Sequence, residues 1–110
     1  MTERHPAPQC TNMQQVRSAI DSIDRDMVRL IAERLGYVAA AARIKESRDS
    51  VRDEARIADV LSKVAAEAQA QGIAPEFVTT LYRQMIEASI AHELALFDAR
   101  AQRQDASAQG

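Results

Sequence analysis

Apolar residues recur at helical spacing along the first half of the chain. The stripe consists of Val16, Ile20, Ile23, Met27, Leu30, Tyr37, Ala41 and Ile44. Thr11 and Gln14 form a capping-box pattern directly before this stripe, which predicts that a helix begins near Asn12. Apart from Gly36, no helix breaker follows before the polar cluster 46–53. The pattern therefore predicts one helix of about 33 residues, or about 50 Å.

Two further helices follow from the rest of the pattern. A helix over residues 53–71, terminated by Gly72, has an apolar face made of Ile57, Val60, Leu61 and Val64. Pro75 suits the first turn of a last helix, which reaches about Arg100. One stripe along this helix consists of Val78, Leu81, Met85, Ala88, His92 and Ala95. The stripe beside it consists of Tyr82, Ile86, Ser89, Glu93 and Phe97. The second stripe turns polar halfway along, which indicates a pocket.

The composition agrees with an all-α protein of one domain. The chain has 110 residues, only three Gly and three Pro, and aromatic residues at 4%, so long stretches have high helix propensity. Residues 1–10 and 101–110 have no apolar period, and we expect them to be a flexible arm and a flexible tail. The helical domain is predicted to span residues 11–100.

The length of the first helix predicts a dimer. A single chain of this size has a radius of gyration of about 13 Å, so a helix of about 50 Å outgrows it. Much of the apolar stripe would contact water unless a second subunit covered it. We therefore expect an obligate homodimer of three-helix chains.

Charge and cysteine content exclude several classes of function. A net charge of -2 and a pI near 5.6 argue against a nucleic-acid partner. Cys10 is the only cysteine, so no intrachain disulfide can form, and together with His5 and His92 it makes no plausible metal set. Without a signal-type segment or an 18-residue apolar run, we expect a cytoplasmic protein with no membrane partner.

Arg34 interrupts the apolar stripe of the first helix. A guanidinium stays charged and is costly to desolvate alone, so it needs an anion from the protein or from a ligand. Lys45 lies on the same helix face, about 16 Å along it, so both side chains can reach one small anion. Arg17 is about 25 Å from Arg34 along the helix, and it could enter only the pocket of a partner subunit.

Three more polar side chains are candidates for the same site. The loop 46–53 would fold Arg56 back toward the end of the first helix, and Ser89 and Glu93 lie one turn apart on the last helix. Each of these residues, taken singly, could equally belong to a solvated helix face. A non-catalytic helical dimer, in which Arg34 forms a register-setting ion pair, is the alternative from another class of protein.

The order of these residues resembles the all-helical, type II chorismate mutase family, including its relative isochorismate pyruvate lyase. The resemblance covers residues 10–97. It is carried by Arg17 in V-R-S-A-I-D, Arg34 in A-E-R-L, Lys45 in R-I-K-E, Arg56 in E-A-R-I, and Ser89 and Glu93 in I-E-A-S-I-A-H-E. It implies an intertwined helical homodimer with two pockets, a small dicarboxylate substrate, and no cofactor or metal.

The resemblance also implies a role for each residue. Arg17 would come from the partner subunit, and Arg34 and Arg56 would bind the carboxylates of the ligand. Lys45 would contact the ether oxygen and a carboxylate, and Glu93 would contact the ether oxygen with Ser89 beside it.

Two departures bear on the reaction. Ile57 stands where the mutases usually have a glutamate that binds the C4 hydroxyl of chorismate, and an apolar residue there resembles the lyase. Glu93 stands where the lyase and many bacterial mutases have glutamine. We place the rearrangement of chorismate to prephenate first, because it is the commoner activity of this family. The close alternative is elimination of pyruvate from isochorismate, which forms salicylate.

Overall fold

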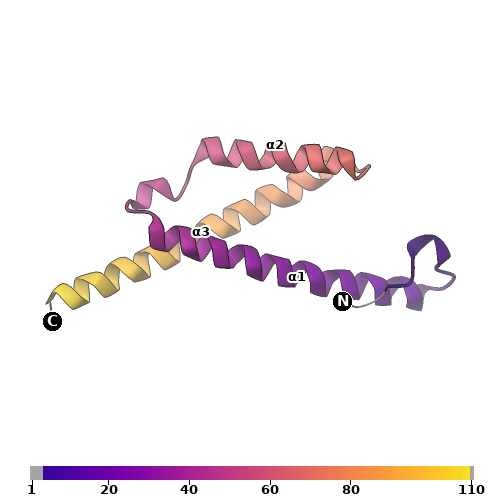
Figure 1. Cartoon of the computed structure of the whole chain (residues 1–110), viewed down its shortest axis with the longest axis horizontal. Helices are drawn as coiled ribbons and strands as arrows, with labels where there is room; N and C mark the ends of the chain where they lie inside the picture. The colour runs from indigo at the N-terminus through magenta and orange to yellow at the C-terminus, as the bar shows by residue number, and fades with distance from the viewer. Residues whose placement is uncertain (1–3, 110) are drawn as a thin grey trace. The chain divides into compact units, whose positions relative to one another are not determined.

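The computed structural model describes residues 4–109 and is helical throughout its regular elements (Figure 1). The elements are the 3₁₀ turn η1 (Ala7–Gln9), the helix α1 (Met13–Ile44), the 3₁₀ turn η2 (Arg48–Ser50), and the helices α2 (Glu54–Ala70) and α3 (Pro75–Gln109). The all-α class predicted from the sequence is confirmed. Residues 1–3 of the predicted arm and residue 110 of the predicted tail lie outside the described residues.

The helix α1 begins at Met13, one residue after the predicted start near Asn12, and its cap is Asn12 rather than Thr11. The Asn12 side-chain oxygen accepts a hydrogen bond from the Gln15 amide at 2.9 Å, and the Gln15 side chain accepts one from the Thr11 amide at 2.7 Å. The prediction of a Thr11–Gln14 capping box was therefore wrong by one residue. The physical reason is that asparagine is an N-cap at least as good as threonine.

The helices α2 and α3 form a hairpin whose turn is built from local hydrogen bonds (Figure 1). Asp53 caps α2 by accepting a hydrogen bond from the Arg56 amide at 3.1 Å. At the other end, the Ile73 amide donates to the Ala68 carbonyl at 3.0 Å, and Gly72 has a φ of +78°. This is a Schellman ending, which needs a left-handed residue and therefore favours glycine. The predicted bounds of α2 are confirmed to within one residue.

The buried face of α3 is the stripe that turns polar. Ile86, Ser89, Glu93 and Phe97 are all buried, whereas Leu81 of the other predicted stripe is exposed. The helix also continues past the predicted end at Arg100 to Gln109. A carboxylate and a hydroxyl therefore lie among the most buried side chains of this helix, where hydrocarbon side chains are the norm.

The chain divides into two compact units, Met1–Gly36 and Tyr37–Gly110, and the helix α1 is continuous through the boundary. In the first unit the apolar stripe of α1 is about half exposed, at 50% for Ile20, 51% for Met27 and 55% for Leu30. The single chain thus leaves most of this stripe in contact with water. None of the helices within residues 4–109 combines the length and apolar character needed to cross a membrane.

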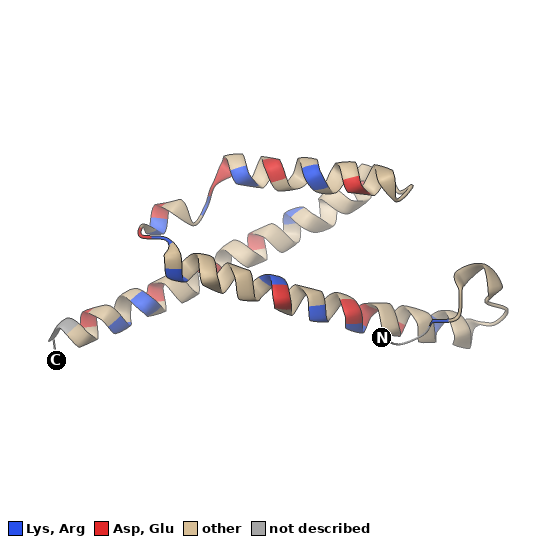
Figure 2. Ribbon diagram, in the orientation of Figure 1, with Lys and Arg blue, Asp and Glu red and all other residues tan. Residues whose placement is uncertain are grey.

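In the second unit, surface ion pairs connect the loop before α2 to α3. The Asp98 carboxylate accepts hydrogen bonds from the Arg48 guanidinium at 2.9 and 3.3 Å, and Glu87 accepts two from Arg52 at 3.0 and 2.8 Å. These hydrogen bonds lower the pKa of Asp98 and the pKa of Glu87. Figure 2 shows that charges of both signs also alternate along α2.

The Arg48–Asp98 pair predicts a pH-dependent contribution to stability. Because the pKa of Asp98 is lowered by folding, the contribution is complete above its ordinary pKa and is lost as the pH falls through the lowered value. We expect Asp98→Asn to lower Tm slightly at pH 7, and this difference to close below about pH 4. Thermal unfolding followed by circular dichroism between pH 7 and pH 2.5 measures it. Asp105→Asn, on an exposed part of the same helix, is the control, and a Tm difference that persists in acid would contradict the prediction.

Candidate active site

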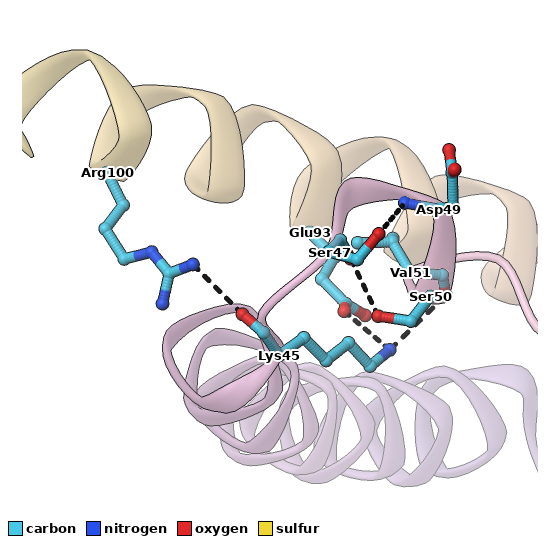
Figure 3. A network of polar contacts seen from close by, with 7 residues as sticks. All are labelled: Lys45, Ser47, Asp49, Ser50, Val51, Glu93 and Arg100. Carbon is cyan, nitrogen blue, oxygen red and sulfur yellow. Dashed lines mark hydrogen bonds and ion pairs between the residues drawn. The ribbon is translucent and has the colours of Figure 1, made fainter. Parts of the chain in front are cut away.

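The centre of the candidate site is an ion pair between the end of α1 and the buried face of α3. Lys45 follows the last residue of α1, and its amide still donates to the Ala41 carbonyl at 2.9 Å. Its ammonium nitrogen lies 2.8 Å from Oε2 of Glu93 and 3.4 Å from the carbonyl oxygen of Val51 (Figure 3). The structure thus brings together two of the residues that the sequence predicted to share a site.

Burial of this pair is asymmetric. The side chain of Glu93 is 9% exposed and that of Lys45 is 29% exposed. A carboxylate in such a place needs a cationic or hydrogen-bonding partner, because desolvation penalises its charged form. Lys45 supplies that partner and remains the more accessible of the two. An anionic ligand would therefore meet the ammonium first.

The loop after α1 positions the second acceptor of Lys45. The Ser47 hydroxyl accepts a hydrogen bond from the Asp49 amide at 3.3 Å, and the Ser50 hydroxyl donates to the Ser47 carbonyl at 2.7 Å (Figure 3). These bonds close the short turn η2 and bring the chain round to Val51, which is 4% exposed. The Val51 carbonyl is then directed at the ammonium of Lys45.

Ser89 and Arg34 occupy environments of intermediate or low exposure. Ser89 is 8% exposed and lies one turn before Glu93 on the same face of α3. Arg34 lies on α1 in the first unit and is half-buried, unlike most basic residues of that helix. Their predicted roles in ligand binding stay predictions.

Arg17 lies on an exposed part of α1. It lines an open hollow of about 380 Å³ whose other lining residues are Gln14, Ser18, Asp21 and Arg25. A guanidinium exposed on an open surface is available to a second molecule. Its predicted role in the site of a partner subunit remains a prediction.

Arg56 and Ile57 begin α2. The guanidinium of Arg56 is directed along its own helix to the Asp59 carboxylate at 2.6 Å, and the side chain is 62% exposed. Hydrogen bonds from Lys63 and Arg56 lower the pKa of Asp59. The structure thus holds Arg56 in a surface ion pair, and Ile57 beside it is half-buried. To bind a carboxylate of a ligand, Arg56 would exchange Asp59 for it.

Sequence reasoning missed the basic residue that contacts the end of α1. Arg100 was predicted only as the approximate end of the last helix. Its guanidinium donates to the carbonyl of Arg43. It also donates to the carbonyl of Lys45 at 3.0 Å (Figure 3). The signal was present in the spacing, since Glu93, Phe97 and Arg100 are four and three residues apart and therefore share a helix face.

The candidate site places a partly exposed ammonium beside a buried carboxylate. Within residues 4–109, no three or more His, Cys, Asp and Glu side chains are grouped so that they could hold a metal ion. The ammonium of Lys45 contacts the Glu93 carboxylate and the Val51 carbonyl, whereas the Arg100 guanidinium contacts the backbone carbonyl of Lys45. A partly buried ammonium can orient a carboxylate and stabilise developing negative charge.

Comparison with known proteins finds a matching family and related enzymes. The family described as chorismate mutase type II matches residues 16–94. The isochorismate pyruvate lyase of Pseudomonas aeruginosa is 36% identical over 85 residues, which are 77% of this chain and 84% of the lyase. The bifunctional chorismate mutase/prephenate dehydratase of Buchnera aphidicola is 32% identical over 81 residues, which are 73% of this chain but only 21% of that protein.

Proposed function

Since the chain belongs to the chorismate mutase type II family, we propose that it is a pericyclic enzyme that acts on isochorismate or chorismate without a cofactor. The observation that carries the proposal is the partly buried ammonium of Lys45, held between Glu93 and the Val51 carbonyl. A fixed cation of this kind suits a reaction in which an ether bond breaks and negative charge grows on its oxygen.

Elimination of pyruvate from isochorismate is the reaction we propose first. From the sequence alone we placed the rearrangement of chorismate first, and two observations now favour the elimination. The relative named isochorismate pyruvate lyase matches over 84% of its own length, so the likeness extends over nearly the whole of a lyase. Ile57 also cannot accept a hydrogen bond from a substrate hydroxyl at the position where the mutases usually have glutamate.

Rearrangement of chorismate to prephenate is the second candidate. It is supported by the relative whose name includes chorismate mutase. Glu93 departs from the glutamine of the lyase, but many bacterial mutases have that glutamine too. Both substrates are dianions with an enolpyruvyl ether, so one cationic site can serve both reactions.

The mechanism needs orientation and charge rather than a nucleophile. Arginine guanidiniums bind carboxylates through two parallel hydrogen bonds, which would hold the flexible dianion in its reactive conformer. Lys45 would donate to the ether oxygen as charge develops there. For Glu93 to donate to the same oxygen it must be protonated, because an ionised carboxylate only accepts hydrogen bonds.

The functional unit we propose is a homodimer. The half-exposed apolar stripe of α1 is a surface that a second copy would cover. Arg17 lies about 25 Å along α1 from Arg34, so it would complete the site of the partner rather than its own.

Product identification with a Lys45 variant tests the proposed reaction. Purified protein is incubated separately with isochorismate and chorismate, and salicylate, pyruvate and prephenate are quantified. We expect salicylate and pyruvate from isochorismate as the faster reaction. Because Lys45 would stabilise the breaking ether bond, Lys45→Ala should reduce kcat by about 100-fold or more.

Lys63→Ala removes an exposed lysine of α2 and is the matched control. Its kcat should stay close to that of the unaltered protein. Prephenate as the faster product would favour the second candidate. Equal turnover by the Lys45 and Lys63 variants would remove Lys45 from the mechanism.

Glu93→Gln tests the part that Glu93 takes in turnover. The Glu93 carboxylate pairs with the ammonium of Lys45, whereas the amide of glutamine carries no charge and can donate a hydrogen bond to the ether oxygen. We expect Glu93→Gln to raise kcat/KM, because it leaves the charge of Lys45 for the dianion. Glu76→Gln, at the exposed start of α3, is the control. A Glu93→Gln variant with the kcat/KM of the control would exclude Glu93.

Subunit mixing tests the predicted exchange of Arg17. Arg17→Ala and Lys45→Ala chains are each expected to be nearly inactive as homodimers. If the site combines Lys45 of one chain with Arg17 of its partner, mixed dimers contain one intact site. Refolding the two variants together should then restore about a quarter of the unaltered activity. No recovery, with dimers verified by size-exclusion chromatography and light scattering, would place both residues in one chain's site or remove Arg17 from it.

A further inference from the structure

The end of α1 presents carbonyl groups that the helix itself cannot satisfy. The last four carbonyls of any α-helix lack partners within the helix, and they carry its partial negative charge. Here the Arg100 guanidinium donates through Nη1 to the Arg43 carbonyl and through Nη2 to the Lys45 carbonyl at 3.0 Å. One side chain of α3 therefore bridges two carbonyls at the base of the proposed catalytic lysine, and Figure 3 shows the contact with Lys45.

Packing determines where this guanidinium lies. The central carbon of the Arg100 guanidinium sits 4.8 Å from the centre of the Phe97 ring, and Phe97 is 8% exposed. The Nε atom of Arg100 is buried and has no hydrogen-bond partner within residues 4–109. A partly desolvated guanidinium over an aromatic ring has little freedom to turn elsewhere.

The same face of α3 thus contacts Lys45 at both ends. Glu93 contacts the ammonium at 2.8 Å, and Arg100, seven residues later, contacts the backbone carbonyl of Lys45. Asp98 adds a surface contact to the following turn through Arg48. Arg100 lies beyond residue 94, where the match to the family ends.

We propose that Arg100 is a positioning residue, which fixes the backbone of Lys45 so that its ammonium lies where the ether oxygen of the substrate will be. The inference rests on the proposed function, and it adds a contribution from the part of α3 outside the matched segment. Arg100 itself touches neither Glu93 nor the substrate in this proposal. Its action passes through the two carbonyls that it holds.

The test compares Arg100→Ala, Arg100→Lys and the matched control Arg103→Ala, an exposed arginine one turn further along α3. Two quantities are measured for each protein: kcat and KM for the better substrate, and amide hydrogen exchange of residues 45–51. Loss of the bridge should speed exchange of this segment. A misplacement of about 1 Å should lower kcat by about 10-fold to 100-fold, with KM changed much less.

Arg100→Lys separates positioning from charge. A lysine keeps the positive charge at the end of α1 but lacks the planar fork that bridges two carbonyls. We expect it to recover the Tm of the unaltered protein and only a small part of kcat. If Arg100→Ala does not fold, as judged by circular dichroism, Arg100→Lys and Arg100→Gln are compared with Arg103→Ala in the same measurements.

Three outcomes would overturn the proposal. In the first, the Arg100 variants have the same amide hydrogen exchange of residues 45–51 and the same kcat as Arg103→Ala. The second is faster exchange with unchanged kcat, which would make Arg100 purely structural. The third is full recovery of kcat by Arg100→Lys, which would make its charge sufficient. If the unaltered protein turned over neither substrate, the proposed function would fail, and the exchange data alone would still decide whether Arg100 holds the segment.

Discussion

The ion pair between Lys45 and Glu93 is the interaction on which the rest of the site depends. An ionised carboxylate that is 9% exposed has lost most of its hydration and needs a cation or several donors beside it. The pair connects the end of α1 to the middle of α3, although the two residues are 48 positions apart in the chain. The loop between α1 and α2 then closes tightly enough to add the Val51 carbonyl to the same ammonium.

The charged contacts of the second unit fall into two kinds with different consequences. Arg48–Asp98 and Arg52–Glu87 are exposed to solvent, and such pairs contribute little to stability, but they connect the loop 46–53 to α3. The pair at Lys45 is partly buried, so water screens it less and its geometry matters more. Under the proposed function, the dianionic substrate would interact with the local charge of Lys45 rather than with the net charge of -2.

Much of the fold could be predicted from local signals. The helix ends are marked by single residues. Asp53 caps α2 with a side-chain hydrogen bond, Gly72 ends α2 with a positive φ, and Pro75 begins α3, where its missing amide is not needed. Each of these signals acts within a few residues. The error at Thr11 arose because two adjacent residues can both cap a helix. The extension of α3 past Arg100 was missed because a polar, alanine-rich segment has helix propensity but no apolar period.

The candidate site was only partly predictable, for a reason visible in its residues. The sequence alone determined three helices, the spacing of Lys45 from Arg34, and the common helix face of Ser89 and Glu93. The reason is that each residue of an α-helix is rotated by a fixed angle from the one before, so sequence spacing gives the face on which a side chain lies. Only the tertiary structure decided that Glu93 is the partner of Lys45 and that Arg100 contacts the end of α1. Those contacts depend on how α1 and α3, which are distant in the chain, pack together. Once packing buries the Glu93 carboxylate, its ionised form needs a cationic partner nearby.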